Sequence, residues 1–167
     1  MRISTPELLK ALSHILTVRG LTLSTCESCT GGMLGSMFTS IPGSSRYYYG
    51  GIISYSDSVK HKIAGVNLQI LKKHGAVSLE TAREMARNIR QLVKSDIGVA
   101  ITGIAGPSGG TAKKPVGLVF IALATRYSVI VKKFLFKGQR NTIREKACFN
   151  ALTILRDHIK IKNKRKS

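Results

Sequence analysis

Apolar residues recur at helical spacing in three long stretches of this sequence, and shorter stretches with strand spacing lie between them. After Thr5-Pro6-Glu7, an apolar stripe with a period of about 3.6 residues predicts a capped first helix that ends near Gly20. A stripe after Ser78-Leu79-Glu80-Thr81 predicts a second helix that ends before Ser95. Residues 141 to about 159 predict a closing helix.

The stretches between these helices are short and rich in β-forming residues. They comprise residues 21–26, 47–55, 97–101, 116–125 and 128–136. The third is uniformly apolar, which is typical of a central strand covered on both faces. The last two are joined tightly at Arg126-Tyr127, which predicts an antiparallel hairpin. We therefore expect an α/β fold, a three-layer α/β/α sandwich with a mixed parallel/antiparallel sheet.

Short helices are expected after two of these strands. Thr30-Gly31-Gly32 opens one of them, which places Ser28 at a strand-to-helix junction. Asp57 is expected to cap the other, which runs through Lys60 and Ile63.

Length and composition predict a single folded domain over residues 1–159. The chain has 167 residues, of which 43% are hydrophobic, so it can bury a sizeable core that needs no disulfide bond or metal ion to stabilise it. Three cysteines are an odd number, which favours reduced thiols. No apolar run approaches the roughly 20 residues that span a bilayer, and the start has no signal-peptide pattern. We expect a cytoplasmic protein without membrane contact.

The formal net charge of +19 restricts the classes of partner. It arises from 27 basic and 8 acidic residues, and such a surplus favours nucleic acid, anionic membranes or phosphorylated small molecules. Residues 160–167 carry five basic side chains and no acid, which predicts a solvated, frayed tail. No aromatic residue interrupts this tail as a stacking platform would. Nucleic-acid binding is therefore the less favoured alternative, although the charge permits it.

Two glycine-rich loops follow strands, and ligands bind beyond the carboxyl ends of strands in open α/β sheets. The first contains Gly31-Gly32, where free N–H groups at a helix start would attract an anion or a developing oxyanion. The second, residues 103–111, offers similar donors around Gly106 and Gly109-Gly110. Tight turns alone can explain such glycines. No P-loop or dinucleotide signature is present, and the four histidines have no ligand-like pairing, so we expect no metal.

The segment Cys26-Glu27-Ser28-Cys29 permits two kinds of chemistry. A C-x-x-C pair at a strand-to-helix junction is the thioredoxin-like redox pattern, but the usual aromatic and proline neighbours are missing. A serine nucleophile would need a base, and neither glycine loop contains a histidine. Lys60 could replace it if burial and neighbouring cations such as Lys62 lowered its pKa. Spacing alone predicts an exposed helix-surface lysine.

Seven sequence blocks, in the same order, resemble the CinA carboxy-terminal domain family between about residues 5 and 158. They are Glu27-Ser28-Cys29-Thr30-Gly31-Gly32, Ile41-Pro42-Gly43-Ser44-Ser45, Tyr55-Ser56-Asp57 through Lys60, Gly65-Val66, His74-Gly75-Ala76-Val77-Ser78, Gly103-Ile104-Ala105-Gly106-Pro107, and Gly109-Gly110-Thr111 through Lys114-Pro115-Val116-Gly117.

This resemblance implies a nicotinamide-nucleotide amidase, which converts nicotinamide mononucleotide and water to nicotinate mononucleotide and ammonia without a cofactor. It implies Ser28 as the nucleophile, Lys60 as its general base, Tyr55 as a hydrogen-bonding assistant and Thr102 as a further polar group near the dyad. Substrate-binding groups would be Thr30, Gly31, Gly32, Gly103, Gly106, Gly109, Gly110, and Arg140 or Arg144 at the phosphate. The resemblance also implies a homo-oligomer, a dimer or larger.

The sequence departs from the family pattern at four positions. It has Cys26 where Ala or Ser is common, Gly50 in place of Arg, Asp57 in place of Asn, and Ser108 in place of Asp. Because Gly50 stands in place of this arginine, the order of the local loop and the contacts with the substrate are expected to differ from those of the family. A catalytically silent domain that binds nucleic acid through its basic surface is the competing hypothesis.

Overall fold

The computed structural model describes residues 3–164 of the chain, which contain both helices and strands. The elements, in chain order, are α1 (Thr5–Val18), β1 (Leu23–Glu27), α2 (Met33–Thr39), the 3-10 turn η1 (Ser44–Arg46), β2 (Tyr48–Ile53), α3 (Asp57–Lys62), α4 (Leu68–His74), α5 (Leu79–Val93), β3 (Ile97–Gly103), β4 (Leu118–Ala124), β5 (Val129–Leu135) and α6 (Arg140–Lys164).

The strands form one five-stranded sheet in the order β2-β1-β3-β4-β5. β1 pairs in parallel with both β2 and β3, whereas β4 is antiparallel to β3 and to β5. The predicted mixed sheet and the predicted hairpin are both confirmed. Three strands therefore end at the same edge of the sheet, the edge where ligands bind in open α/β folds.

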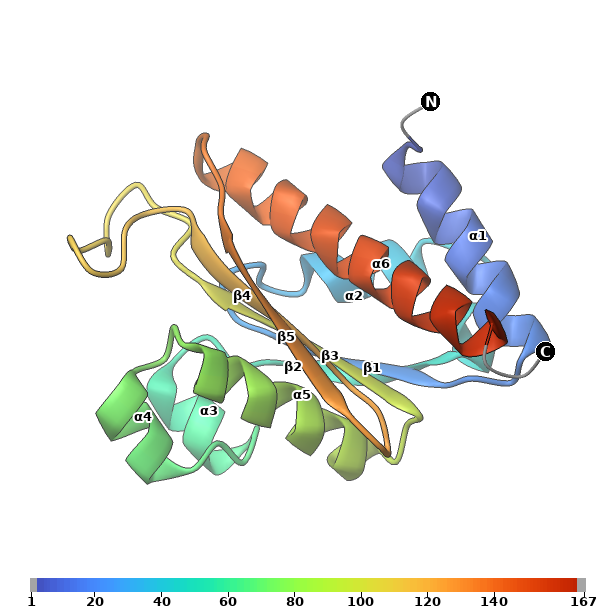
Figure 1. Cartoon of the computed structure of the whole chain (residues 1–167), viewed down its shortest axis with the longest axis horizontal. Coiled ribbons are helices and arrows are strands. Elements are labelled where there is room, and N and C mark those ends of the chain that lie inside the picture. Colours follow the sequence, from blue (N-terminus) through green and yellow to red (C-terminus); the bar gives the residue numbers. More distant parts are fainter. Residues whose placement is uncertain (1–2, 165–167) are drawn as a thin grey trace.

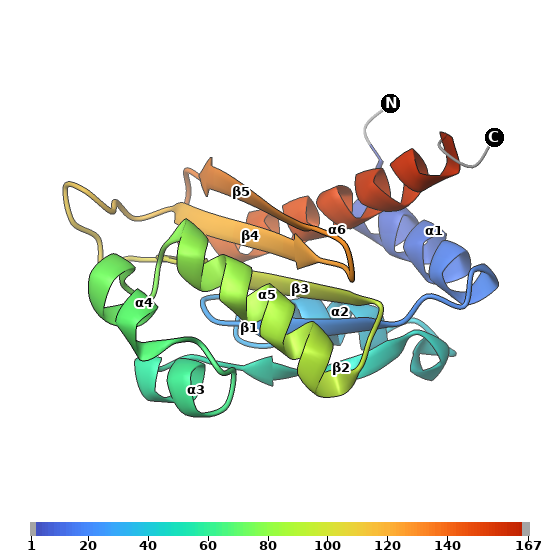
Figure 2. The same ribbon diagram turned by 60° about the horizontal axis from the view of Figure 1, so that its bottom comes forward.

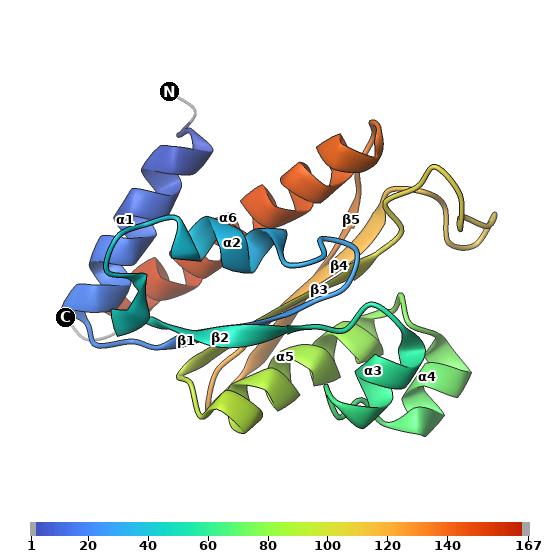
Figure 3. The same cartoon turned by 180° about the vertical axis from the view of Figure 1, so that it is seen from behind.

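Helices cover both faces of this sheet (Figure 1). α1, α2 and α6 lie on one face, and α3, α4 and α5 lie on the other, as Figures 2 and 3 show from two further directions. Each face has its own core cluster, one built on the leucines of α1 and the apolar side of α6, the other on α5. The arrangement confirms the three-layer α/β/α sandwich.

Helix starts follow ordinary capping chemistry, although two caps differ from the sequence prediction. Ser4, rather than Thr5, caps α1, in a capping box with Glu7. Ser56, rather than Asp57, caps α3, because its hydroxyl accepts the Val59 N–H while Asp57 already lies in the first turn. Ser78 caps α5 through the Thr81 N–H, as its sequence context indicates.

Two further elements differ from the pattern-based prediction. α4 is not predicted from the sequence; unlike the two short helices that are predicted, it follows another helix instead of a strand. α6 continues to Lys164, beyond the end predicted near Ile159, so residues 160–164 of the predicted tail have a helical backbone. Residues 165–167 of that tail lie outside the described residues. Within residues 3–164, no helix is long and apolar enough to cross a membrane.

Gly98 allows α5 to pack closely against β3. A Cβ atom at this position would meet the Ala86 carbonyl oxygen and would lie 2.8 Å from the Arg90 Cβ atom, both on α5. Since β3 is the central strand, this contact sets how α5 lies over the middle of the sheet.

We predict that Gly98→Ala lowers the free energy of unfolding by about 1–3 kcal/mol, because the new methyl group forces α5 away from β3. Ser36→Ala, on the exposed side of α2, is the control and should change it by less than about 0.5 kcal/mol. Urea denaturation of both variants checks this. Equal midpoints for the two would contradict the packing role of Gly98.

Candidate functional site

The ends of β2, β1 and β3 are held level with one another. Glu27 is paired with Ile53 on one side and with Ile101 on the other. Just beyond, the Ser54 N–H donates to the Glu27 carbonyl at 2.7 Å, and the Ser28 N–H donates to the Ile101 carbonyl at 2.9 Å. Ser28 and Ser54 therefore follow directly after the ends of β1 and β2, and Thr102 is the penultimate residue of the neighbouring strand β3.

Glu27 connects the end of β1 to the start of α2. Its carboxylate is 1% exposed and accepts the backbone N–H groups of Gly32, Leu34 and Gly35 at 3.1, 3.0 and 2.8 Å. The N-cap residue of α2 is Gly32, which has no side chain to do this. A carboxylate at this position satisfies the N–H groups at the helix start and complements the helix dipole. Sequence reasoning missed this role of Glu27.

This contact changes which backbone donors are available beside Ser28. The Gly31 N–H donates to the Ser28 carbonyl at 3.0 Å, and the Gly32 N–H is bound by Glu27. The two donors expected to be free at the helix start are thus occupied. Among residues 3–164, neither the Cys29 N–H nor the Thr30 N–H donates a hydrogen bond to another residue. These two N–H groups are therefore the unoccupied backbone donors next to Ser28, and both residues are buried.

Lys60 is buried, although spacing alone predicts an exposed residue. Its side chain is 2% exposed, and Nζ donates to the carbonyl oxygens of Ser54 at 2.9 Å and Tyr55 at 3.3 Å. Burial lowers the pKa of Lys60 below 10.5, whereas the exposed carboxylate of Asp57, at 3.8 Å, acts in the opposite direction. Desolvation, rather than a neighbouring cation such as Lys62, is therefore the main cause of the shift.

Ser28 and Lys60 are both anchored at the neighbouring ends of β1 and β2, through different contacts. Ser28 follows β1 and is 7% exposed, while the Lys60 amine is bound to Ser54, whose N–H is bound to Glu27. Among residues 3–164, no hydrogen bond joins the Ser28 hydroxyl directly to the Lys60 amine. The dyad stays a prediction, supported by this shared anchoring.

Two arginines from α6 also reach this edge of the sheet. Arg140 donates to the Tyr55 hydroxyl at 2.9 Å and to the Gly106 carbonyl at 2.8 Å. Arg144 donates to the Thr30 carbonyl at 2.8 Å, and its Nε is buried without a partner in the described part of the chain. These bonds bring the loop after β1, the end of β2 and the loop after β3 together with the start of α6.

Thr102 lies on the end of β3 with its side chain fully buried. Its hydroxyl donates to the Ala76 carbonyl at 2.7 Å, which fixes the segment between α4 and α5. Within the described residues it makes no hydrogen bond to Ser28 or Lys60. The contacts of Thr102 thus support a positioning role for it.

The loop between β3 and β4 projects away from the sheet (Figure 1). Gly103 and Gly110 are explained by packing, because a Cβ atom on either would lie less than 3.0 Å from β4 or Val116. Gly106 and Gly109 have φ angles of +73° and +85°, which favour glycine. Lys114 ties the loop back to the body of the protein, since its Nζ donates to the His74 carbonyl at 2.6 Å.

The cysteine pair lacks the properties of a redox site. Cys26 and Cys29 are both buried and free, and burial raises the pKa of each thiol to about 11. A reactive thiolate requires the opposite shift. The redox alternative is therefore disfavoured.

In the part of the chain that the structure describes, no group of three or more His, Cys, Asp or Glu side chains could hold a metal ion.

Comparison with protein families places this arrangement among known proteins. Residues 6–159 match the family model described as the CinA C-terminal domain. A protein of Caldanaerobacter subterraneus subsp. tengcongensis, named for competence-damage induction, is 46% identical over 153 residues, which are 92% of this chain and 37% of that protein. One of Moorella thermoacetica is 50% identical over 141 residues, 84% of this chain and 34% of that protein. The chain thus spans little more than a third of these curated relatives.

Solved structures show the same fold. A CinA superfamily protein from Enterobacter cloacae superposes with a TM-score of 0.91 at 35% identity, covering 95% of this chain and 94% of that one. A competence/damage inducible protein from Agrobacterium tumefaciens gives a TM-score of 0.89 at 37% identity, covering 93% and 97%.

We predict that Glu27→Ala lowers the free energy of unfolding by roughly 3 kcal/mol, because three N–H groups at the start of α2 lose a charged acceptor. Glu7→Ala removes the exposed carboxylate of the α1 capping box and should cost only about 1 kcal/mol. Urea denaturation compares the two. A loss for Glu27→Ala no larger than that for Glu7→Ala would contradict the role of Glu27.

Proposed function

This chain belongs to the CinA C-terminal domain family, and on that premise we propose that it deamidates nicotinamide mononucleotide to nicotinate mononucleotide and ammonia. The observation that carries this proposal is the buried Lys60 amine, with a lowered pKa, held at the strand ends from which Ser28 extends. An unmodified lysine is a poor base at neutral pH because it is protonated, and burial reduces that obstacle.

The proposed reaction begins with attack of the Ser28 Oγ on the carboxamide carbon of the substrate. A neutral Lys60 amine can donate its two hydrogens to the Ser54 and Tyr55 carbonyl oxygens, and its lone pair then accepts the serine proton. When the C–N bond of the tetrahedral intermediate breaks, Lys60 returns this proton to the departing ammonia. An ester between Ser28 and the nicotinoyl group remains.

Hydrolysis of this ester completes the cycle. Lys60 takes a proton from water, the resulting hydroxide attacks the ester carbon, and Lys60 protonates the Ser28 oxygen as it leaves. Water is the second substrate, so the proposed reaction requires no cofactor. In both proposed steps the Thr30 N–H stabilises the negative oxygen. This role is supported by its position two residues after the nucleophile and by its lack of a hydrogen-bond partner among residues 3–164.

The phosphate of the substrate fits the two arginines of α6. Arg140 and Arg144 each use part of their donors on Tyr55, Gly106 and Thr30, and a guanidinium group has further N–H donors for a phosphate. Tyr55 would assist indirectly, because its hydroxyl holds the Arg140 side chain in place. Thr102 would assist by holding the segment around Ala76 in place.

Assembly into a homo-oligomer stays a prediction of the family resemblance.

Replacement of the nucleophile tests the proposal directly. Ser28→Ala should lower kcat for ammonia release from nicotinamide mononucleotide by about a thousandfold or more, because the covalent route is lost. Ser36→Ala, on the exposed side of α2, is the matched control and should retain full activity. Release of ammonia is followed with a coupled glutamate dehydrogenase assay. Unchanged kcat in Ser28→Ala would contradict the proposal, and binding of nucleic acid by a protein that releases no ammonia would support a silent domain.

The pH dependence tests the role of Lys60. We predict that kcat/KM rises with pH through the pKa of Lys60, below 10.5, because the neutral amine is the base. Asp57 raises this pKa, so Asp57→Asn should move the rising limb to lower pH. Glu80→Gln, which removes an acid paired with His74, is the control and should leave the limb in place. If the rising limb does not move in Asp57→Asn, the limb reports the titration of a group other than Lys60, and the proposed role of Lys60 is contradicted.

A further inference from the structure

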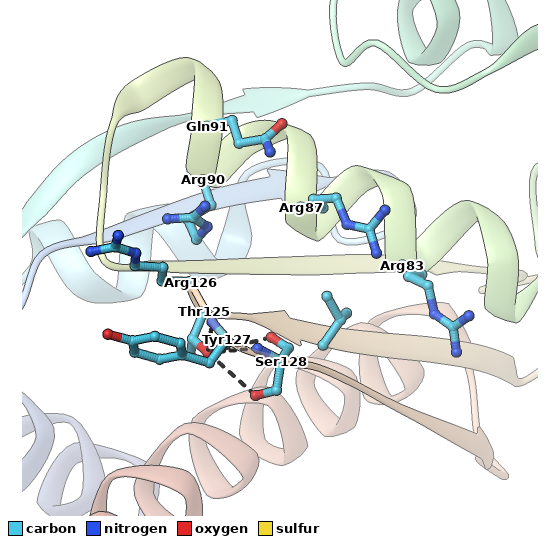
Figure 4. A pocket seen from close by; sticks show the side chains of 9 residues that line it. Arg83, Arg87, Arg90, Gln91, Thr125, Arg126, Tyr127 and Ser128 are labelled. Atoms are coloured by element: carbon cyan, nitrogen blue, oxygen red, sulfur yellow. Dashed lines mark hydrogen bonds between the residues drawn. The ribbon is translucent and has the colours of Figure 1, made fainter.

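A second site lies between α5 and the turn that joins β4 to β5 (Figure 4). It is a surface hollow of about 330 Å³, and four arginines line it, Arg83, Arg87 and Arg90 from α5 and Arg126 from the turn. The turn follows Ala124, which pairs with Gly98 at the start of β3, whereas Thr102 at the other end of β3 pairs with Phe120. This hollow is therefore at the opposite end of the sheet from Ser28.

The charges of these arginines are not neutralised by the protein. In the described part of the chain, none of the four forms an ion pair with a carboxylate. Glu84, on the same helix, accepts the Asn67 N–H instead, and Asp96, which lines a neighbouring hollow beside Arg126, accepts from Thr22. Four like charges around one hollow repel one another, so an anion bound there would be stabilised by all of them.

The site is also held in shape before any ligand binds. The Thr125 hydroxyl accepts the N–H groups of Tyr127 and Ser128 at 3.3 and 3.2 Å, which fixes the turn that carries Arg126. Arg90 donates to the Ser95 carbonyl at 3.5 Å, and its Nε is buried without a hydrogen-bond partner among residues 3–164. A buried donor without an acceptor is costly, and a bound anion would supply the acceptor.

The spacing of the arginines indicates the size of the anion. Arg83, Arg87 and Arg90 are at positions i, i+4 and i+7 of α5, so they lie on one side of the helix over about 10 Å of its length. They can contact several adjacent negative groups at the same time. These three arginines are spread along one hollow, whose volume is at the lower end of the range of about 300–1,000 Å³ that is typical for small-molecule sites. This size favours a compact ligand over a long strand.

We propose that this arginine-lined hollow binds a small molecule that carries two or more linked phosphates, such as an inorganic or nucleoside polyphosphate. Guanidinium groups suit this ligand because their paired N–H donors match phosphate oxygens. The site does not depend on the amidase activity, since it lies at the opposite end of the sheet from Ser28. Its occupant would be a second ligand of the protein.

Calorimetric titration with inorganic tripolyphosphate, at fixed ionic strength, tests the site. The unmodified protein should bind it, and Arg83→Gln/Arg87→Gln should bind about tenfold or more weakly, because two charge-assisted contacts are lost. Lys72→Gln/Lys73→Gln on α4 is the matched control, since it removes the same charge from another exposed helix surface and should leave affinity nearly unchanged. Both variants should release ammonia from nicotinamide mononucleotide like the unmodified protein.

Three outcomes would overturn the proposal. They are the absence of tripolyphosphate binding, an equal loss of affinity in the two double variants, and binding of a dT20 oligonucleotide that tripolyphosphate does not displace. A parallel titration with adenosine triphosphate separates the sources of the phosphates: tighter binding than tripolyphosphate assigns a nucleoside polyphosphate, and equal or weaker binding assigns the phosphate chain alone. In ¹⁵N-labelled protein, the Arg90 Nε–H signal should shift on addition of tripolyphosphate, because this group gains an acceptor.

Discussion

The buried carboxylate of Glu27 is the interaction on which the candidate site depends. It joins the end of β1 to the first turn of α2 through three N–H groups, and Ser28, Cys29 and Thr30 lie in the short segment between them. The direction of that segment is therefore fixed by the strand register on one side and by Glu27 on the other. The same contact occupies the Gly32 N–H, so that the Cys29 and Thr30 N–H groups are the donors next to Ser28 without a partner among the described residues.

Burial of Lys60 is the second constraint, and it connects structure to chemistry. The fold places this amine against the Ser54 and Tyr55 carbonyl oxygens at the end of β2, where the charged form is poorly solvated. The carboxylate of Asp57, 3.8 Å from the amine, partly opposes the shift. The arginine-lined hollow at the opposite end of the sheet adds a separate site for phosphates.

The fold was largely predictable from sequence, because its strands and long helices carry clear apolar periods and its hairpin has a short connection, residues 125–128. α4 was missed because it follows another helix, whereas the short helices α2 and α3 were expected after strands. The candidate site was predictable only as a set of loops. Burial of Lys60 depends on how α3 lies against Ser54 and Tyr55 just after β2. The contact of Glu27 depends on α2 turning back onto β1, and local spacing in the sequence encodes neither arrangement. A glutamate before the serine and ahead of a Gly-Gly pair was the available signal for the second.

The covalent intermediate on Ser28 is the central claim of this account. It is tested most directly by mixing the protein with excess nicotinamide mononucleotide, quenching in acid at millisecond intervals, and measuring the mass of the peptide that contains Ser28. We predict a transient mass increase equal to the nicotinoyl ribotide group, located on Ser28. Formation of nicotinate mononucleotide with Ser28 unmodified at every quench time would contradict the account.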